Sequence, residues 1–198
     1  MNYYLLRQDI SIADRWALGP VSDLDNWRLI TPPVELMEPG GYTVDIRQDG
    51  VEVDYSLAGY ASAPVLSAKA CAALAGLAEV DAPHRHVVLA PLVVVGSDPD
   101  RAYFLMIVET RLDCVDEDRS EFGRFERDDP VRPDLAGQYQ YFFNLVVDPG
   151  RAASRHIFRL EKYPGALVVS EDVRVRFERA GMVGARFESV NGDARIVA

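Results

Sequence analysis

The sequence predicts an α+β fold in which a mixed or mainly antiparallel sheet has two main helices packed on it. Strand-like runs, rich in β-branched and aromatic residues, outnumber the helix-like stretches and do not alternate regularly with them. A chain of 198 residues with 48% hydrophobic residues is long enough for one domain with its own core. We therefore expect residues 1–198 to form a single domain, with an N-terminal hairpin lobe within residues 1–60.

The hairpin is predicted at residues 42–55, where two alternating apolar and polar runs flank Asp49 and Gly50. With these two residues as the loop, Asp45 faces Asp54 on the solvent side of the hairpin. Like charges directly opposite each other weaken a hairpin. We therefore interpret Asp45 and Asp54 as a candidate contact site for a partner.

Two helices are predicted from their caps and apolar stripes. The first follows Ser67 over residues 68–79, and the second follows Ser170 over residues 171–180 and ends at Gly181 in a left-handed conformation. The strands expected around them are 87–95, 103–109, 141–147, 157–160, 166–169 and 185–190.

The composition limits the possible partners. Lys and Arg total 21 against 31 Asp and Glu, a formal net charge of −10. This charge argues against nucleic acid or an anionic membrane and favours a basic partner. The first residues have neither the basic nor the long apolar region of a secretory signal, so we expect a cytoplasmic protein. In that compartment Cys71 and Cys114 are expected to be buried thiols.

The chain lacks the spacing of a phosphate-binding loop, a dinucleotide-binding turn, a nucleophile elbow or a zinc-binding helix. We therefore expect no catalytic residue, metal or cofactor. His84 and His86 have no evident further ligand and are interpreted as solvent-facing residues. Cys71 has no strong thiolate-stabilising charge nearby. The carboxylates after Asp113 do not have the spacing of an EF-hand.

Half of the excess negative charge lies in residues 113–134, here called the acidic segment. It contains nine carboxylates and four arginines, a net charge of −5. Phenylalanines lie between these carboxylates, a pattern typical of apolar anchors inside an acidic interface rim. A solvated loop is the alternative interpretation. The candidate contact residues of the segment are Asp116, Glu117, Asp118, Glu121, Phe122, Phe125 and Asp128.

Five short stretches have an order and spacing that point to one family. They are Pro64-Val65-Leu66-Ser67, Val115-Asp116-Glu117-Asp118-Arg119-Ser120-Glu121-Phe122, His156-Ile157-Phe158-Arg159-Leu160, Val168-Val169-Ser170-Glu171 and Gly181-Met182-Val183-Gly184-Ala185-Arg186-Phe187. Together they resemble the bacterial immunity proteins of polymorphic-toxin systems, long catalogued as a domain of unknown function. The resemblance implies a protein that binds a cognate toxin and blocks it, without catalysis, and we expect the blocking to occur by occlusion. The acidic charge would suit a basic toxin, because opposite charges accelerate association.

Two other functions stay open on the residues alone. A small cytosolic enzyme or ligand sensor would use a pocket lined by Tyr139, Tyr141 and His156. A structural scaffold would self-associate without a different partner. The sequence does not predict the oligomeric state.

Overall fold

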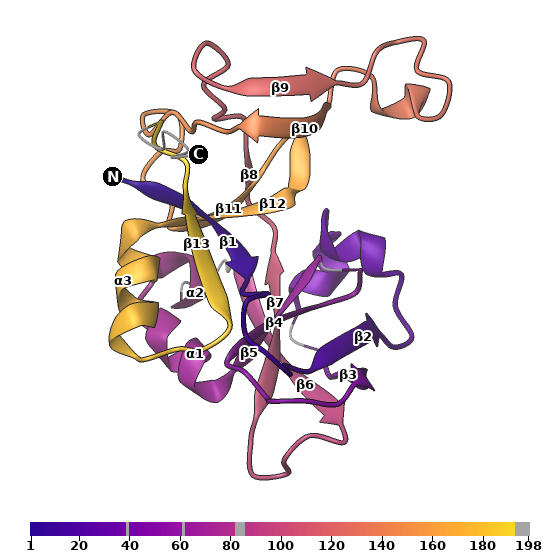
Figure 1. Cartoon of the computed structure of the whole chain (residues 1–198), viewed down its shortest axis with the longest axis vertical. Helices are drawn as coiled ribbons and strands as arrows, with labels where there is room; N and C mark the ends of the chain where they lie inside the picture. The colour runs from indigo at the N-terminus through magenta and orange to yellow at the C-terminus, as the bar shows by residue number, and fades with distance from the viewer. Residues whose placement is uncertain (39, 61, 82–85, 193–198) are drawn as a thin grey trace.

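The protein is mostly β, with 40% strand and 17% helix. The structure is a computed structural model that describes residues 1–38, 40–60, 62–81 and 86–192. Figure 1 shows strands running through the whole molecule, with α1, α2 and α3 gathered on one side. The predicted α+β fold with two main helices on a sheet is therefore wrong, because the helices are short and the N-terminal third is richer in strands than its sequence indicated.

A six-stranded sheet forms one half of the molecule, in the order β2-β3-β6-β7-β5-β4. It curls until its edge strands approach each other, since the Gly59 N–H donates to the Gly19 carbonyl at 3.1 Å. The sheet is thus nearly closed, like a small barrel. Its strands are β2 (Ala17–Val21), β3 (Tyr42–Gln48), β4 (Tyr55–Ala58), β5 (Ala63–Ser67), β6 (Val87–Val95) and β7 (Tyr103–Val108).

A five-stranded sheet forms the other half, in the order β13-β1-β12-β11-β8. Its strands are β1 (Tyr3–Gln8), β8 (Arg111–Leu112), β11 (Ile157–Leu160), β12 (Tyr163–Ser170) and β13 (Ala185–Ser189). The N-terminal strand β1 therefore lies between two strands from the C-terminal part of the chain. A separate pair, β9 (Glu121–Arg124) and β10 (Tyr139–Asn144), lies at one end of the molecule (Figure 1).

The helices are short and begin at capping serines. Ser67 caps α1 (Ala68–Leu74), and Ser170 caps α3 (Glu171–Arg179). The predicted helix 68–79 ends early because the chain turns at Gly76, whose φ is +83°, before α2 (Ala78–Asp81) begins. Three 3₁₀ turns complete the described elements: η1 (Asn26–Leu29), η2 (Val34–Met37) and η3 (Pro133–Leu135). In the described ranges no helix has the length and apolarity needed to cross a bilayer.

The predicted hairpin at residues 42–55 is absent. Strand β3 pairs with β2 on one side and in parallel with β6 on the other, while Val51 bridges to Arg15. Gly50 does not form the turn of a hairpin but lies against the backbone near Asp14. A Cβ atom there would lie 2.2 Å from the Asp14 carbonyl oxygen, so glycine permits close contact between two backbone segments.

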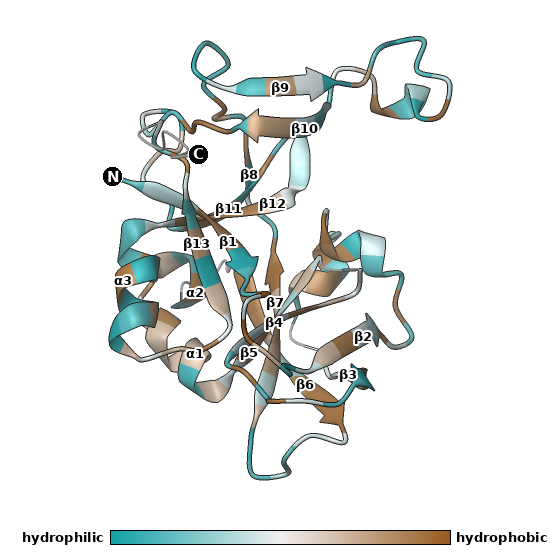
Figure 2. Ribbon diagram, viewed as in Figure 1, coloured by the Kyte–Doolittle hydropathy of each residue, from teal (hydrophilic) through white to brown (hydrophobic). Residues whose placement is uncertain are grey.

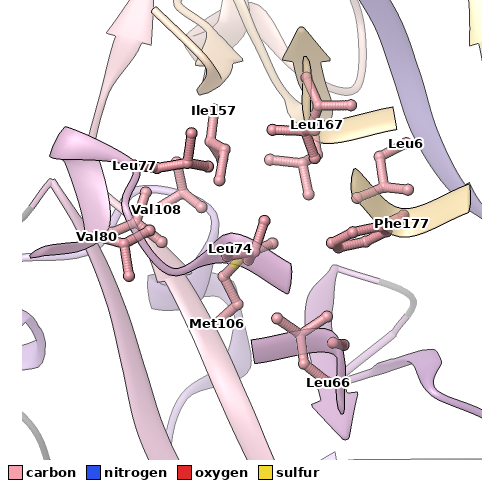
Figure 3. Packing of buried hydrophobic residues seen from close by; sticks show 14 of the residues in the cluster. Leu6, Leu66, Leu74, Leu77, Val80, Met106, Val108, Ile157, Leu167 and Phe177 are labelled. Atoms are coloured by element: carbon pink, nitrogen blue, oxygen red, sulfur yellow. The ribbon is translucent and has the colours of Figure 1, made fainter. Parts of the chain in front are cut away.

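The helices and both sheets share one hydrophobic cluster (Figure 3). Leu74 of α1 lies beside Met106 of β7, Leu77 lies near Ile157 of β11, and Phe177 of α3 packs beside Leu6 of β1. The opposite face of β6 and β7 lines a second cluster inside the curled sheet. Figure 2 shows these central strands as the most hydrophobic part of the fold, in contrast to the hydrophilic loop between β9 and β10.

Candidate partner-binding surface

The acidic segment, residues 113–134, forms a projecting part of the molecule. It follows β8, includes β9 and continues into the loop with η3 that leads to β10. Figure 1 shows this loop extending away from both large sheets. The segment is anchored at its base, where Val115 bridges to Val147 and both side chains are buried. The arrangement presents charged side chains at a distance from the core.

Five of the nine carboxylates in the acidic segment are already engaged within the molecule. Asp129 accepts hydrogen bonds from the N–H groups of Val131 and Arg132, which hold the pKa of its carboxyl below the ordinary value. The other four engaged carboxylates make ion pairs. These are Asp113 with Lys162 and Arg151, Asp116 with Arg119, Glu117 with Arg124, and Asp134 with Arg132.

The remaining carboxylates are Asp118, Glu121, Glu126 and Asp128. All four are exposed, and none makes an ion pair with another described residue. Three of them were predicted as contact residues. Because no internal cation offsets their charge, they contribute most directly to the negative potential around the projecting segment. Asp116 and Glu117, in contrast, are partly neutralised by their arginines.

Phe122 is a structural residue. Its ring packs edge-on against Tyr139, with 4.9 Å between centroids, and it also contacts Phe142. The guanidinium of Arg124 lies 5.1 Å from the centroids of both Phe122 and Tyr139. Burial, and then the hydrogen bond that its hydroxyl donates to Glu117, raise the pKa of Tyr139 to about 12. This cluster holds β9 and β10 on the body of the protein. Phe125 is half-buried, and its backbone N–H donates to the Gln138 carbonyl at 3.0 Å.

The exposed aromatic side chains of this region lie instead on β10. Tyr141 and Phe143 are 44% and 69% exposed, and their rings contact each other with 5.0 Å between centroids. Gly123 makes room for Tyr141, since a Cβ there would lie 2.6 Å from the tyrosine ring. Phe143 was not among the predicted contact residues. Three aromatic residues in a row, Tyr141-Phe142-Phe143, were the available signal, because side chains on both faces of a strand cannot all enter one core.

The model of the Immunity protein family (Imm11) matches residues 79–192. This match covers more than half of the chain and includes the whole acidic segment and the β9–β10 pair. The chain belongs to this immunity protein family. The predicted resemblance is confirmed, and family membership indicates an immunity function. A comparison with curated proteins finds none that matches the chain.

The family match begins after Asp45 and Asp54, and the structure separates these two residues. Asp45 is exposed on β3, far from the acidic segment (Figure 1). Asp54 is only 5% exposed and accepts hydrogen bonds from Ser67 and the Val183 N–H. The two carboxylates do not face each other as predicted, because the hairpin that would have paired them does not form.

The three residues of the alternative pocket have separate surroundings. Tyr139 is buried against Phe122, and its backbone N–H bonds to Lys162 beyond the end of β11. His156 precedes the other end of β11, where its Nδ1 lies 2.8 Å from the Ser170 hydroxyl. Tyr141 is exposed beside Phe143. The immunity protein therefore does not bring these side chains together in one site.

The cysteines and histidines weighed for catalysis or metal binding do not form a reactive or metal-binding group among the described residues. Burial raises the pKa of the Cys71 and Cys114 thiols to about 12, so both are protonated at neutral pH. His86 Nδ1 lies 3.2 Å from a carboxylate oxygen of Glu109, and His84, which was expected to face solvent like His86, lies outside the described residues. Within the described ranges, no three His, Cys, Asp or Glu side chains are grouped as metal ligands would be.

Proposed function

We propose that this immunity protein binds and neutralises a basic toxin domain of a polymorphic-toxin system in the cytoplasm, and that its acidic segment and β10 form the contact surface. The observation that carries this proposal is the exposed Tyr141–Phe143 pair on β10, next to β9 with Glu121, which makes no ion pair with another described residue. Tyrosine and other large aromatic side chains are enriched among residues that dominate binding energy. Surrounding charges mainly set the association rate and the choice of partner.

The two parts of this surface have different physical roles. Tyr141 and Phe143 would be buried by the toxin and would slow dissociation. Asp118, Glu121 and Asp128 would attract lysines and arginines of the toxin during approach. The proposed mechanism is occlusion: the projecting segment covers a functional surface of the toxin, and the immunity protein performs no chemical step. Phe122 and Glu117 act indirectly by holding β9 and β10 in place.

The first test is co-expression of the protein with the product of the neighbouring gene, scored by growth rescue and co-purification. The charge variant is Asp118→Asn, Glu121→Gln and Asp128→Asn combined. We expect its association rate at low salt to fall by about tenfold, with a weaker dependence on salt, because long-range attraction is reduced. Stopped-flow mixing at several salt concentrations measures both quantities.

A matched control removes three exposed carboxylates from the other end of the molecule. Asp14→Asn, Asp45→Asn and Asp49→Asn combined produce the same change in net charge without touching the acidic segment. We expect this control to alter association much less than the first variant. Equal slowing by both sets of substitutions would mean that only the total charge matters, and would contradict the proposed surface. Absence of both rescue and complex formation would overturn the toxin-binding proposal itself.

A further inference from the structure

A pocket of about 290 Å³ lies at the junction of the two large sheets. Its walls include Leu6 of β1, Leu57 of β4 and Leu167 of β12, so both halves of the fold contribute to it. Arg159 of β11 and Tyr55 of β4 also line it. The pocket is distinct from the acidic segment and from the aromatic pair on β10.

Arg159 is a buried cation without a carboxylate partner. Its side chain is 1% exposed, and no acidic group of the described residues lies within ion-pair distance. Nη1 donates to the Pro164 carbonyl at 2.9 Å and Nη2 to the Ser62 carbonyl at 3.0 Å, while Nε has no hydrogen-bond partner. Burial lowers the pKa of Arg159 to about 10, which leaves the guanidinium charged at neutral pH. An uncompensated buried charge of this kind destabilises a fold unless an anion neutralises it.

Tyr55 gives a second, independent indication of a missing ligand. Its side chain is fully buried, and its hydroxyl makes no hydrogen bond in the described structure. Buried hydroxyl groups in proteins nearly always have a partner. Two residues that line the pocket, Arg159 and Tyr55, thus each have a donor whose hydrogen-bonding capacity no described residue uses, and both donor atoms lie beneath the water-accessible surface. Both are donors that a carboxylate can accept from.

The rim of the pocket also favours an anion. Arg7 and Arg186 line it together with Glu188, and this one carboxylate pairs with both arginines, at 2.7 and 3.7 Å. The rim and the buried Arg159 therefore carry three positive charges and one negative charge. This local excess runs against the overall charge of −10, so it does not follow from the general composition.

The walls indicate the rest of the ligand. Four leucines line the pocket together with Arg159, so a ligand needs an apolar body as well as an acidic group. Inorganic phosphate or sulfate would satisfy the charge and leave the apolar walls uncovered. Because Arg159 lines the pocket and is only 1% exposed, a ligand must enter the pocket deeply to approach its guanidinium. This requirement suits a small free molecule better than a side chain attached to a partner protein.

We propose that this pocket binds a small organic carboxylate with an apolar body, held by Arg159 and Tyr55. Such a ligand would join β1 and β12 of one sheet to β4 of the other and would stabilise their packing. The site goes beyond toxin binding and can be tested without any toxin.

The test is a titration of the full-length protein with hexanoate, followed by ¹H–¹⁵N NMR. We expect saturable shifts at pocket residues with a dissociation constant of about 1 mM or tighter, and a rise in the melting temperature as the acid is added. Hexanol and hexylamine are the matched probes, since they keep the apolar chain and remove the carboxylate. They should bind at least about tenfold more weakly.

Two variants test the residues. Arg159→Met retains most of the side-chain volume and should weaken hexanoate binding at least about tenfold. Gly165→Leu blocks the pocket independently, because Gly165 lines it and a Cβ there would meet no atom within 4 Å. Gly41→Leu is the control, since Gly41 is equally unobstructed and lies outside this pocket.

The NMR spectrum of each variant also reports whether it is folded, so Gly165→Leu decides the question if Arg159→Met unfolds. Loss of hexanoate binding in Gly165→Leu and its retention in Gly41→Leu would support the proposal. The proposal is overturned if hexanoate does not bind, if hexanol binds equally well, or if a folded Arg159→Met variant retains full affinity.

Discussion

Asp54 joins three parts of the chain through a single carboxylate. Its oxygens lie 2.6 Å from Lys69 Nζ at the start of α1 and 3.6 Å from Arg101, and they accept hydrogen bonds from Ser67 and the Val183 N–H. Burial alone would raise the pKa of Asp54, but the hydrogen bonds from Lys69, Val183 and Ser67 outweigh it and hold the pKa below its ordinary value. The residue predicted as a partner contact is therefore a cross-link inside the fold.

This arrangement predicts the acid sensitivity of the protein. The stabilisation from Asp54 is fully present above its unfolded-state pKa of about 4 and is lost as pH falls through the lower folded-state pKa. We expect Asp54→Asn to reduce the free energy of unfolding at neutral pH by about 2 kcal/mol, a deficit that shrinks as the wild-type carboxyl becomes protonated. Urea unfolding at neutral and acidic pH measures it.

The exposed Asp45→Asn variant serves as the control for Asp54 and should change stability by less than about 0.5 kcal/mol. A deficit in Asp54→Asn that stays constant down to low pH would contradict the assignment of the effect to the charged carboxylate.

At the scale of elements, β9 and β10 separate a structural face from an exposed one. Phe122 and Phe142 pack against a third hydrophobic cluster, which includes Val115, Tyr139 and Phe158. Tyr141 and Phe143 remain accessible. We expect Tyr141→Ala and Phe143→Ala each to weaken toxin binding by about 2 kcal/mol, mainly through faster dissociation, while stability changes little. Surface plasmon resonance for binding and urea unfolding for stability test the two expectations separately.

Trp27→Ala is the matched control for these aromatic substitutions. Trp27 is also exposed and stacks on another exposed aromatic residue, Tyr60, but it belongs to η1 and not to the β9–β10 pair. Its removal should leave toxin binding unchanged. If Trp27→Ala weakens binding as much as Tyr141→Ala, the contact surface extends beyond β10 and the proposed assignment is incorrect.

The elements that the sequence predicted well are those whose signals are local. The continuous apolar run at 87–95 is β6. Helix α3 begins after the predicted capping residue Ser170 and ends before Gly181, as predicted. The hairpin prediction failed because β3 pairs with β6, a strand separated from it by about forty residues, and local alternation does not identify a distant partner. Strand β10 begins two residues before the predicted start and ends before Leu145, because the following residues pass into the chain that bridges to Val115.

The candidate surface was also predictable only in part, because local sequence patterns do not show which residues are brought together by the fold. Carboxylate spacing located the acidic segment, but ion pairs formed in the fold decide which of its charges remain available. Phe122 and Phe143 are both aromatic residues in strands. Only their burial in the folded protein shows that Phe122 anchors the β9–β10 pair, whereas Phe143 is exposed. Arg159 lay within a stretch recognised from the family resemblance, yet its isolation from any carboxylate is a property of the assembled sheets.

At the scale of the whole molecule, the N-terminal part is interlaced with the region that matches the family. Strand β1 lies between β12 and β13, and β5 and β3 flank the β6–β7 pair. Successive residues of β7 face different clusters, since Met106 belongs to the first and Ile107 to the second. Strands β6 and β7 contribute side chains to both the first and the second cluster. Loss of packing in one cluster would therefore also destabilise the strands on which the other cluster depends.

We predict from this interlacing that the chain unfolds in one cooperative transition. Trp16 reports on the second cluster, where it is 1% exposed and donates to Ser56 Oγ at 2.6 Å, and far-UV circular dichroism reports on the helices around the first. In a Trp27→Phe variant, which leaves Trp16 as the only tryptophan, the two signals should give the same urea midpoint. An earlier fluorescence midpoint would instead mean that the curled six-stranded sheet unfolds as an independent unit, because loss of the second cluster would then leave the helices packed on the remaining sheet.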